Sequence, residues 1–191
     1  MRSLILAAMI VLSPAVAHAE LNRVRVGDSV WASPRLTPPA GWKDDPDAGL
    51  AEQMSVLVPD GVDPDEARAI ILGAAIAVDS SRGDVPADLD DFIASQHALM
   101  LQADPAARFT EIAAMTSADG RGLRAFLFDP GATNGLNWQI LVYGHENDLQ
   151  MGVNHIMIML AADSREQRDA GRPALAATVA AYVTAGQDAP E

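Results

Sequence analysis

The sequence NWQILVYGHENDLQMGVNHIMIML, residues 137–160, decides the fold of this chain. Two apolar segments, 137–145 and 152–160, flank the polar stretch 146–150, which is the pattern of a β-hairpin. Successive side chains of a strand point to opposite faces of the sheet, so each segment divides into two sets. One set is apolar throughout and is predicted to face the core: Trp138, Ile140, Val142, Ile156, Ile158 and Leu160.

The opposite face of this hairpin is mixed in character and is the first candidate for a binding surface. The residues on it that suit ligand contact are Tyr143, His155, Met157 and Met159. Methionine is flexible and polarisable, so a surface where it lies beside an aromatic ring can adapt to a ligand. The alternative interpretation is that a helix packs on this face and buries it as a second core.

More strands are predicted before this hairpin. Residues 109–117 and 121–128 flank Asp119-Gly120, a dipeptide that suits a two-residue type I′ turn. Residues 54–58 and 68–78 have the composition of two further strands, and a short strand is expected within 24–31. In the strand at 68–78, the alternate residues predicted to face the core are Ile70, Leu72, Ile76 and Val78.

Two helices complete the predicted fold. Pro86 suits a first helical turn, and apolar residues then recur at helical spacing from Leu89 to Met100, before Asp104-Pro105 ends the run. A second helix is expected from residue 163 to about 184, kinked or restarted at Pro173. We therefore expect an α+β fold, in which helices flank an antiparallel sheet of about six or seven strands as an α/β/α sandwich.

No pattern typical of catalysis is present. The chain has no cysteine, which excludes a thiol nucleophile and a thiolate metal site. It also has no GxSxG elbow, HExxH helix, Walker loop or GxGxxG fingerprint. We predict no catalytic residue and no cofactor, although a triad assembled from distant positions would leave no such motif.

The histidines argue against a metal site. If the hairpin turns near Asp148, His145 lies opposite Met151, and His155 is four residues further along, about 13 Å away. A zinc ion needs both nitrogens at about 2.1 Å. No shared metal is therefore predicted, and His97, beside the apolar stripe of its helix, is predicted to lie at the edge of the core.

Two acidic loops raise calcium as an alternative. They contain Asp44, Asp45 and Asp47, and Asp60, Asp63, Asp65 and Glu66. Calcium needs six to eight oxygen ligands, and neither loop has the D-x-[DN]-x-[DN]-G order. Aspartates beside proline and glycine are common turn formers, which is the favoured interpretation.

The first nineteen residues are typical of a cleavable export signal. Arg2 precedes an apolar run at 4–12, Pro14 breaks the run, and Ala17-His18-Ala19 is the small-x-small pattern that signal peptidase recognises. The run is shorter than a membrane span, and without cysteine the chain cannot be a lipoprotein. We expect a signal peptide at 1–19, a single domain at 20–185 and a loose tail at 186–191. The product would be periplasmic or secreted, with no stable membrane anchor.

The mature chain is strongly acidic. Removal of residues 1–19 leaves 12 basic against 26 acidic residues, a formal charge of −14. Such a surface repels phosphates, so nucleic-acid binding is disfavoured. Arg165, Arg168 and Arg172 recur at helical spacing and could clamp an anion, but a solvated face is the favoured interpretation.

The predicted order of elements, with Pro39-Ala40-Gly41-Trp42 near its start, resembles the PsbP-like fold. The resemblance covers most of residues 22–184. Relatives with this fold include a photosystem II extrinsic subunit, a Ran-binding import cofactor and bacterial envelope proteins of the DcrB type. The resemblance implies a non-enzymatic accessory or binding role and transfers no functional residue. The chain departs from the lipoprotein members because it has no lipobox cysteine.

We therefore expect an exported domain of the bacterial envelope with a non-catalytic accessory or protein-binding role and an envelope protein as its partner. The alternative is a periplasmic protein that binds a small molecule or a cation. It would use the face that carries Tyr143 and His155, or the acidic loops.

Overall fold

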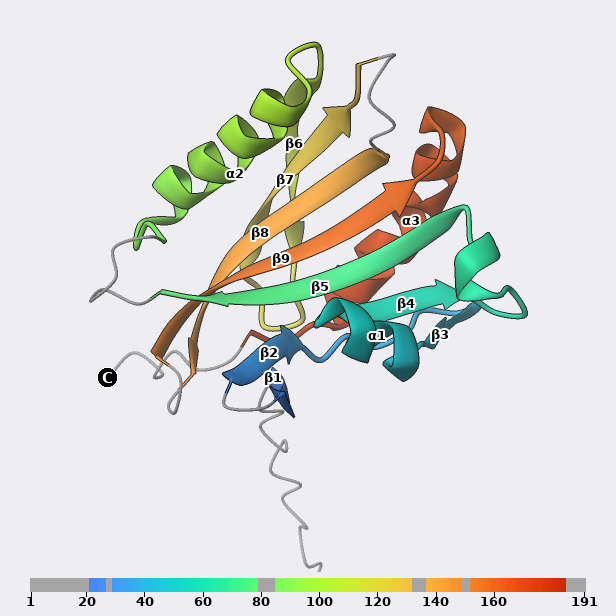
Figure 1. Ribbon diagram of the computed structural model, residues 1–191, viewed down its shortest axis with the longest axis horizontal. Coiled ribbons are helices and arrows are strands. Elements are labelled where there is room, and N and C mark those ends of the chain that lie inside the picture. Colours follow the sequence, from blue (N-terminus) through green and yellow to red (C-terminus); the bar gives the residue numbers. More distant parts are fainter. Residues whose placement is uncertain (1–20, 27–28, 79–84, 132–136, 149–151, 185–191) are drawn as a thin grey trace, which may run out of the picture.

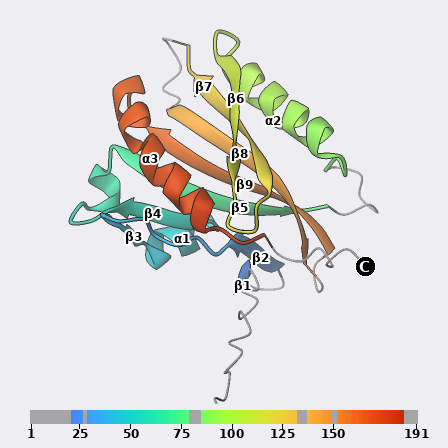
Figure 2. The same ribbon diagram turned by 180° about the vertical axis from the view of Figure 1, so that it is seen from behind.

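The computed structural model of the chain describes residues 21–26, 29–78, 85–131, 137–148 and 152–184. The predicted signal peptide and tail lie outside these residues. The described chain forms an α+β fold in which a seven-stranded antiparallel sheet has helices on both faces (Figures 1 and 2). The predicted fold class is confirmed.

The elements follow the predicted order, with additions near the start. The first half of the chain contains β1 (Leu21–Val26), β2 (Ser29–Pro34), β3 (Trp42–Asp44), α1 (Pro46–Glu52), β4 (Ser55–Pro59), a 3₁₀ turn (Pro64–Glu66) and β5 (Ala69–Ala77). The second half contains α2 (Leu89–Ala103), β6 (Arg108–Thr116), β7 (Gly122–Asp129), β8 (Trp138–Asp148), β9 (Gly152–Ala162) and α3 (Arg165–Ala181). The strands β1 and β2 pair with each other as a separate hairpin.

The hairpin of β8 and β9 joins the two halves of the large sheet. The strand order is β3-β4-β5-β9-β8-β7-β6. β9 pairs with β8 from Ala162 to Gly152, and on its other side with β5 from Ala162 to Asn154. The stretch 137–160 therefore lies at the centre of the sheet, with β5 from the first half of the chain on one side and β7 from the second half on the other.

The face of β8 and β9 that is predicted to be core packs against α3. Ile140, Ile158 and Leu160 are fully buried in one cluster with Leu175 of α3, and Figure 2 shows α3 crossing this face. Gly171 allows the close approach, because a Cβ added there would come within 3.0 Å of the Leu160 side chain. This part of the predicted core is confirmed.

The helix α2 covers the opposite face. Its Phe92 and Ile93 are buried against Tyr143 and other rings of β7 and β8. The Asp88 carboxylate caps the helix by accepting hydrogen bonds from the backbone N–H groups of Asp90 and Asp91. A side-chain acceptor and acidic residues at this end stabilise a helix, because its first N–H groups lack partners and its dipole is positive there.

The predicted core face of β5 is wrong. Ile71, on the α3 face, is fully buried, whereas the predicted set of Ile70, Leu72, Ile76 and Val78 is half-buried on the α2 face. The physical reason is the position of α2, which lies toward the β6 to β8 side of the sheet (Figure 1). The α2 face of β5 is therefore only partly covered.

The predicted turn between β6 and β7 is also wrong. The loop is three residues, 118–120, closed by a hydrogen bond from the Ser117 N–H to the Arg121 carbonyl. Its last residue is a glycine at φ +82°, the left-handed position that completes this common hairpin loop. Pairing therefore starts with Thr116 opposite Gly122, whereas a two-residue turn at Asp119-Gly120 would place Thr116 opposite Leu123.

Candidate functional site

The four predicted binding residues lie together on the α2 face, and α2 covers them unequally. Tyr143 and His155 are 0% exposed, whereas Met157 and Met159 are half-buried. The alternative of a covering helix is therefore confirmed for the first two residues. These four residues form neither an open surface nor a closed core, because the two methionines of β9 lie next to β5, whose α2 face is only partly covered.

A groove of about 430 Å³ lies between α2 and β5. Its lining consists of Ile76, Val85, Pro86, Phe92, Ser95, Gln96, Ala98, Leu99 and Gln102. None of the four predicted binding residues belongs to this lining. The signal that points to it is Leu99, a large apolar residue that falls outside the helical stripe predicted to be buried and is 60% exposed.

His155 connects the sheet to the segment that precedes α2. Its Nε2 lies 2.6 Å from the carbonyl oxygen of Pro86, and because a carbonyl can only accept, Nε2 carries the proton and donates. Phe92 stacks on the imidazole, with ring centroids 4.1 Å apart. Burial lowers the pKa of His155, and the hydrogen bond to Pro86 opposes this effect. The ring is therefore neutral at pH 7, and its Nδ1 is a bare acceptor.

His145 lies directly opposite His155, with ring centroids 4.7 Å apart. The predicted separation of about 13 Å is wrong. The ladder continues to the pair of Asp148 and Gly152, which places the centre of the hairpin two residues later than predicted and moves every partner by four. The Nδ1 atoms of both histidines are buried and have no hydrogen-bond partner among the described residues, an arrangement that costs about 1–3 kcal/mol per group.

Tyr143 is the centre of an aromatic cluster beneath α2. Its ring centroid is 6.2 Å from that of Phe92 and 5.9 Å from those of His97 and Phe126. Burial raises the pKa of the Tyr143 hydroxyl, for which the described residues provide no hydrogen-bond partner. A phenol that stays neutral among rings offers no base at pH 7, so its role here is packing.

Two aspartates of the acidic loops bind nearby backbone, Asp45 as the N-cap of α1 and Asp63 in a turn. The carboxylate of Asp45 accepts a hydrogen bond from the Ala48 N–H, and that of Asp63 accepts one from the Asp65 N–H. Within the described residues, no group of three or more His, Asp or Glu side chains gathers where it could hold a metal ion. Both are hydrogen bonds from a nearby backbone N–H to a carboxylate, the kind that shapes turns and the starts of helices.

Among the described residues, no helix combines the length and apolar character needed to cross a membrane. Comparison of the chain with protein-family models, with curated proteins and with solved structures finds no match. The function is therefore argued from the geometry of the groove between α2 and β5.

Proposed function

We propose that this chain is an exported, non-catalytic binding domain of the bacterial envelope, and that its groove receives an apolar segment of a partner protein. The observation that carries the proposal is Leu99, which is 60% exposed beside a lining that includes Ile76, Val85 and Phe92. Apolar surface in water costs about 25 cal/mol per Å². A partner that covers Leu99 and fills the groove recovers this free energy.

The length of the groove favours a chain segment over a compact ligand. Its α2 wall runs from Phe92 to Gln102, which corresponds to about 15 Å of helix. The amides of Gln96 and Gln102 can donate to and accept from a peptide backbone. The volume also lies within the range of small-molecule pockets, so a small apolar ligand is the second candidate.

Charge and hydroxyl chemistry support the same role. The formal net charge of −13, with Asp90 and Asp91 in the first turn of α2, favours a neutral or basic partner over an acidic one. The hydroxyl of Ser95, in the groove lining, donates a hydrogen bond to the Phe92 carbonyl of its own helix, which agrees with a non-catalytic role. The likeness of the element order to the PsbP-like fold, whose relatives are accessory proteins, adds to this support.

Site-specific photo-crosslinking tests the proposal. The mature chain, with a crosslinking residue at position 99 or at position 50, is incubated with envelope extract and the adduct is identified by mass spectrometry. Leu50 is a matched control because it is 55% exposed but lies on α1. We expect a single defined adduct, through an apolar peptide of the partner, from position 99 alone. With the purified partner, Leu99→Glu should weaken binding at least about tenfold, while Leu50→Glu should not.

Two results would contradict the proposal. Equal crosslinking at both positions would mean that contact is unspecific, and no adduct at position 99 would mean that the groove has no protein partner. A small molecule retained by the purified protein in native mass spectrometry, and lost in Leu99→Glu, would instead support the second candidate.

A further inference from the structure

The pair of His145 and His155 has the spacing of two imidazoles that share a metal ion. The rings are direct cross-strand neighbours, with centroids 4.7 Å apart. Two imidazoles that bind one ion at about 2.1 Å, with a near-tetrahedral angle between them, have centroids about 5 Å apart. The separation of the two rings is therefore close to that of two imidazoles on one ion.

The positions of the protons favour the same arrangement. The Nε2–H of His155 donates to the Pro86 carbonyl, so the lone pair of this ring lies on Nδ1. A metal-bound histidine usually donates its other ring nitrogen to a carbonyl or carboxylate, which fixes the ring and its tautomer. The Nδ1 atoms of His155 and His145 are both buried, and within the part of the chain that the structure describes neither has a hydrogen-bond partner. A cation between the rings would satisfy both atoms.

We propose that His145 and His155 bind one divalent transition-metal cation, of the class of Zn²⁺, Ni²⁺ and Cu²⁺, through their Nδ1 atoms. Imidazole suits these ions, whereas Mg²⁺ and Ca²⁺ prefer oxygen ligands. Among the described residues no third His, Asp or Glu completes a metal-binding group, so water or a group from a partner fills the remaining positions. The protein therefore supplies two of the ligands, and Cu²⁺ should bind more tightly than Ni²⁺ or Zn²⁺.

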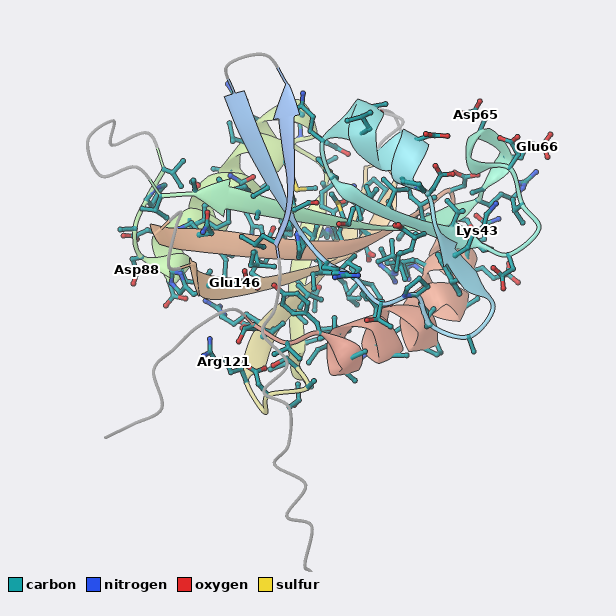
Figure 3. All side chains as sticks on the ribbon, turned by 90° about the horizontal axis from the view of Figure 1, so that it is seen from below. Lys43, Asp65, Glu66, Asp88, Arg121 and Glu146 are labelled. Atoms are coloured by element: carbon teal, nitrogen blue, oxygen red, sulfur yellow. The ribbon has the colours of Figure 1, made fainter. Side chains whose placement is uncertain are left out.

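The surrounding charge is compatible with a cation. Asp88, the exposed cap of α2, lies close enough to His155 to act on the ring electrostatically. Figure 3 shows Asp88 and Glu146 toward the same end of the sheet. A nearby carboxylate and an acidic chain both lower the free energy of a bound cation. Neither histidine belongs to the groove lining, although Pro86 and Phe92, which contact His155, do.

His97 supplies a matched control. It is a half-buried imidazole in the same layer, but it stacks on Phe109 with ring centroids 3.7 Å apart. Its other ring neighbours are Phe126 and Tyr143. An imidazole surrounded by carbon rings should contribute nothing to metal binding, so His97→Gln should leave it unchanged.

Calorimetry and thermal unfolding of the tag-free mature protein test the site. After treatment with a chelator, the protein is titrated with Zn²⁺, Ni²⁺, Cu²⁺ or Mg²⁺. We expect one equivalent of each transition metal to bind and raise Tm, because binding to the native state stabilises it, and we expect no effect of Mg²⁺. His145→Gln should weaken binding at least about tenfold.

Spectroscopy of the Cu²⁺-loaded protein provides a second test, which counts the nitrogens bound to the ion. Electron paramagnetic resonance should show coupling to two imidazole nitrogens in the wild type and in His97→Gln, and to one in His145→Gln. The proposal is overturned if the wild type binds no metal, if it shows fewer than two nitrogens, or if His145→Gln binds as tightly as the wild type. Equal losses in His97→Gln and His145→Gln would also overturn it.

Discussion

Arg168 is a cation that the fold has taken out of water. It is 3% exposed, its guanidinium pairs with Asp129 and Asp169, and it lies over the ring of Trp138. The favoured interpretation of the α3 arginines as a solvated face is wrong for this residue. Helical spacing shows that the three arginines share a side of the helix, but it does not show that the end of β7 brings Asp129 against Arg165 and Arg168. The anion that Arg168 and Arg165 clamp is a carboxylate of the same chain.

Substitution of Arg168 should therefore be costly, while that of its exposed neighbour should not. We expect Arg168→Ala to lower the free energy of unfolding by about 3 kcal/mol, because it leaves the Asp129 carboxylate without its buried partner. Arg165→Ala removes an exposed contact to the same carboxylate and should cost less than about 1 kcal/mol. Urea unfolding of both variants measures the two losses of unfolding free energy. Equal losses would show that burial of Arg168 contributes nothing to stability.

At the scale of the element, the packing of α2 depends on an imidazole that must stay neutral. From α2, His97 contacts the rings of Phe109, Phe126 and Tyr143. Burial, assisted by the Arg124 charge, lowers the pKa of His97 to about 4, and Glu111 acts in the opposite direction. Protonation would place a charge among these rings, so acid should weaken the contact between α2 and the sheet.

The sign of this pH effect follows from the two pKa values. Unfolded His97 takes up a proton near pH 6.5 and folded His97 near pH 4, so the unfolded state binds more protons between them. The contribution of neutral His97 is fully present above about pH 6.5 and is lost as the pH falls. Between pH 7 and pH 5 the loss should be about 1–2 kcal/mol, with allowance for the partial exposure of the ring.

The variant His97→Phe isolates this contribution. Phenylalanine keeps a ring against Phe109 but does not titrate, so the variant should lose less stability than the wild type between pH 7 and pH 5. Urea unfolding of both proteins at the two pH values measures the difference. His155, whose pKa burial also lowers, is common to both proteins and cancels in the comparison. Identical losses would assign the acid sensitivity to groups other than His97.

At the scale of the whole molecule, the predicted export can be tested through cleavage of the signal peptide. Signal peptidase accepts small side chains at the two positions that Ala17 and Ala19 occupy, whereas the residue between them, His18, is unconstrained. In a Gram-negative host, the full chain should yield a periplasmic product whose mass corresponds to a start at Glu20. Ala19→Leu should block this cleavage and His18→Leu should not. A product in the cytoplasm that keeps its first nineteen residues would contradict the prediction.

The sequence by itself determined the elements from β4 onward and the faces of the central hairpin, whereas only one short strand was predicted where β1, β2, β3 and α1 lie. Apolar alternation in 137–160 and helical spacing after Pro86 depend on local geometry, so the β8 and β9 faces, α2 and α3 were predictable. The same alternation was enough to gather Tyr143, His155, Met157 and Met159 on one face. These statements need only the positions of residues along one strand or one helix.

The tertiary structure alone decided which residues meet across elements. The pairing of His145 with His155 depends on where the hairpin turns, and a change of two residues there separates the rings by about 13 Å. The groove beside Leu99 depends on how α2 sits over the sheet, which is set by packing with rings of β6 to β8. Both features result from contacts between distant segments, and a local pattern carries no information about such contacts.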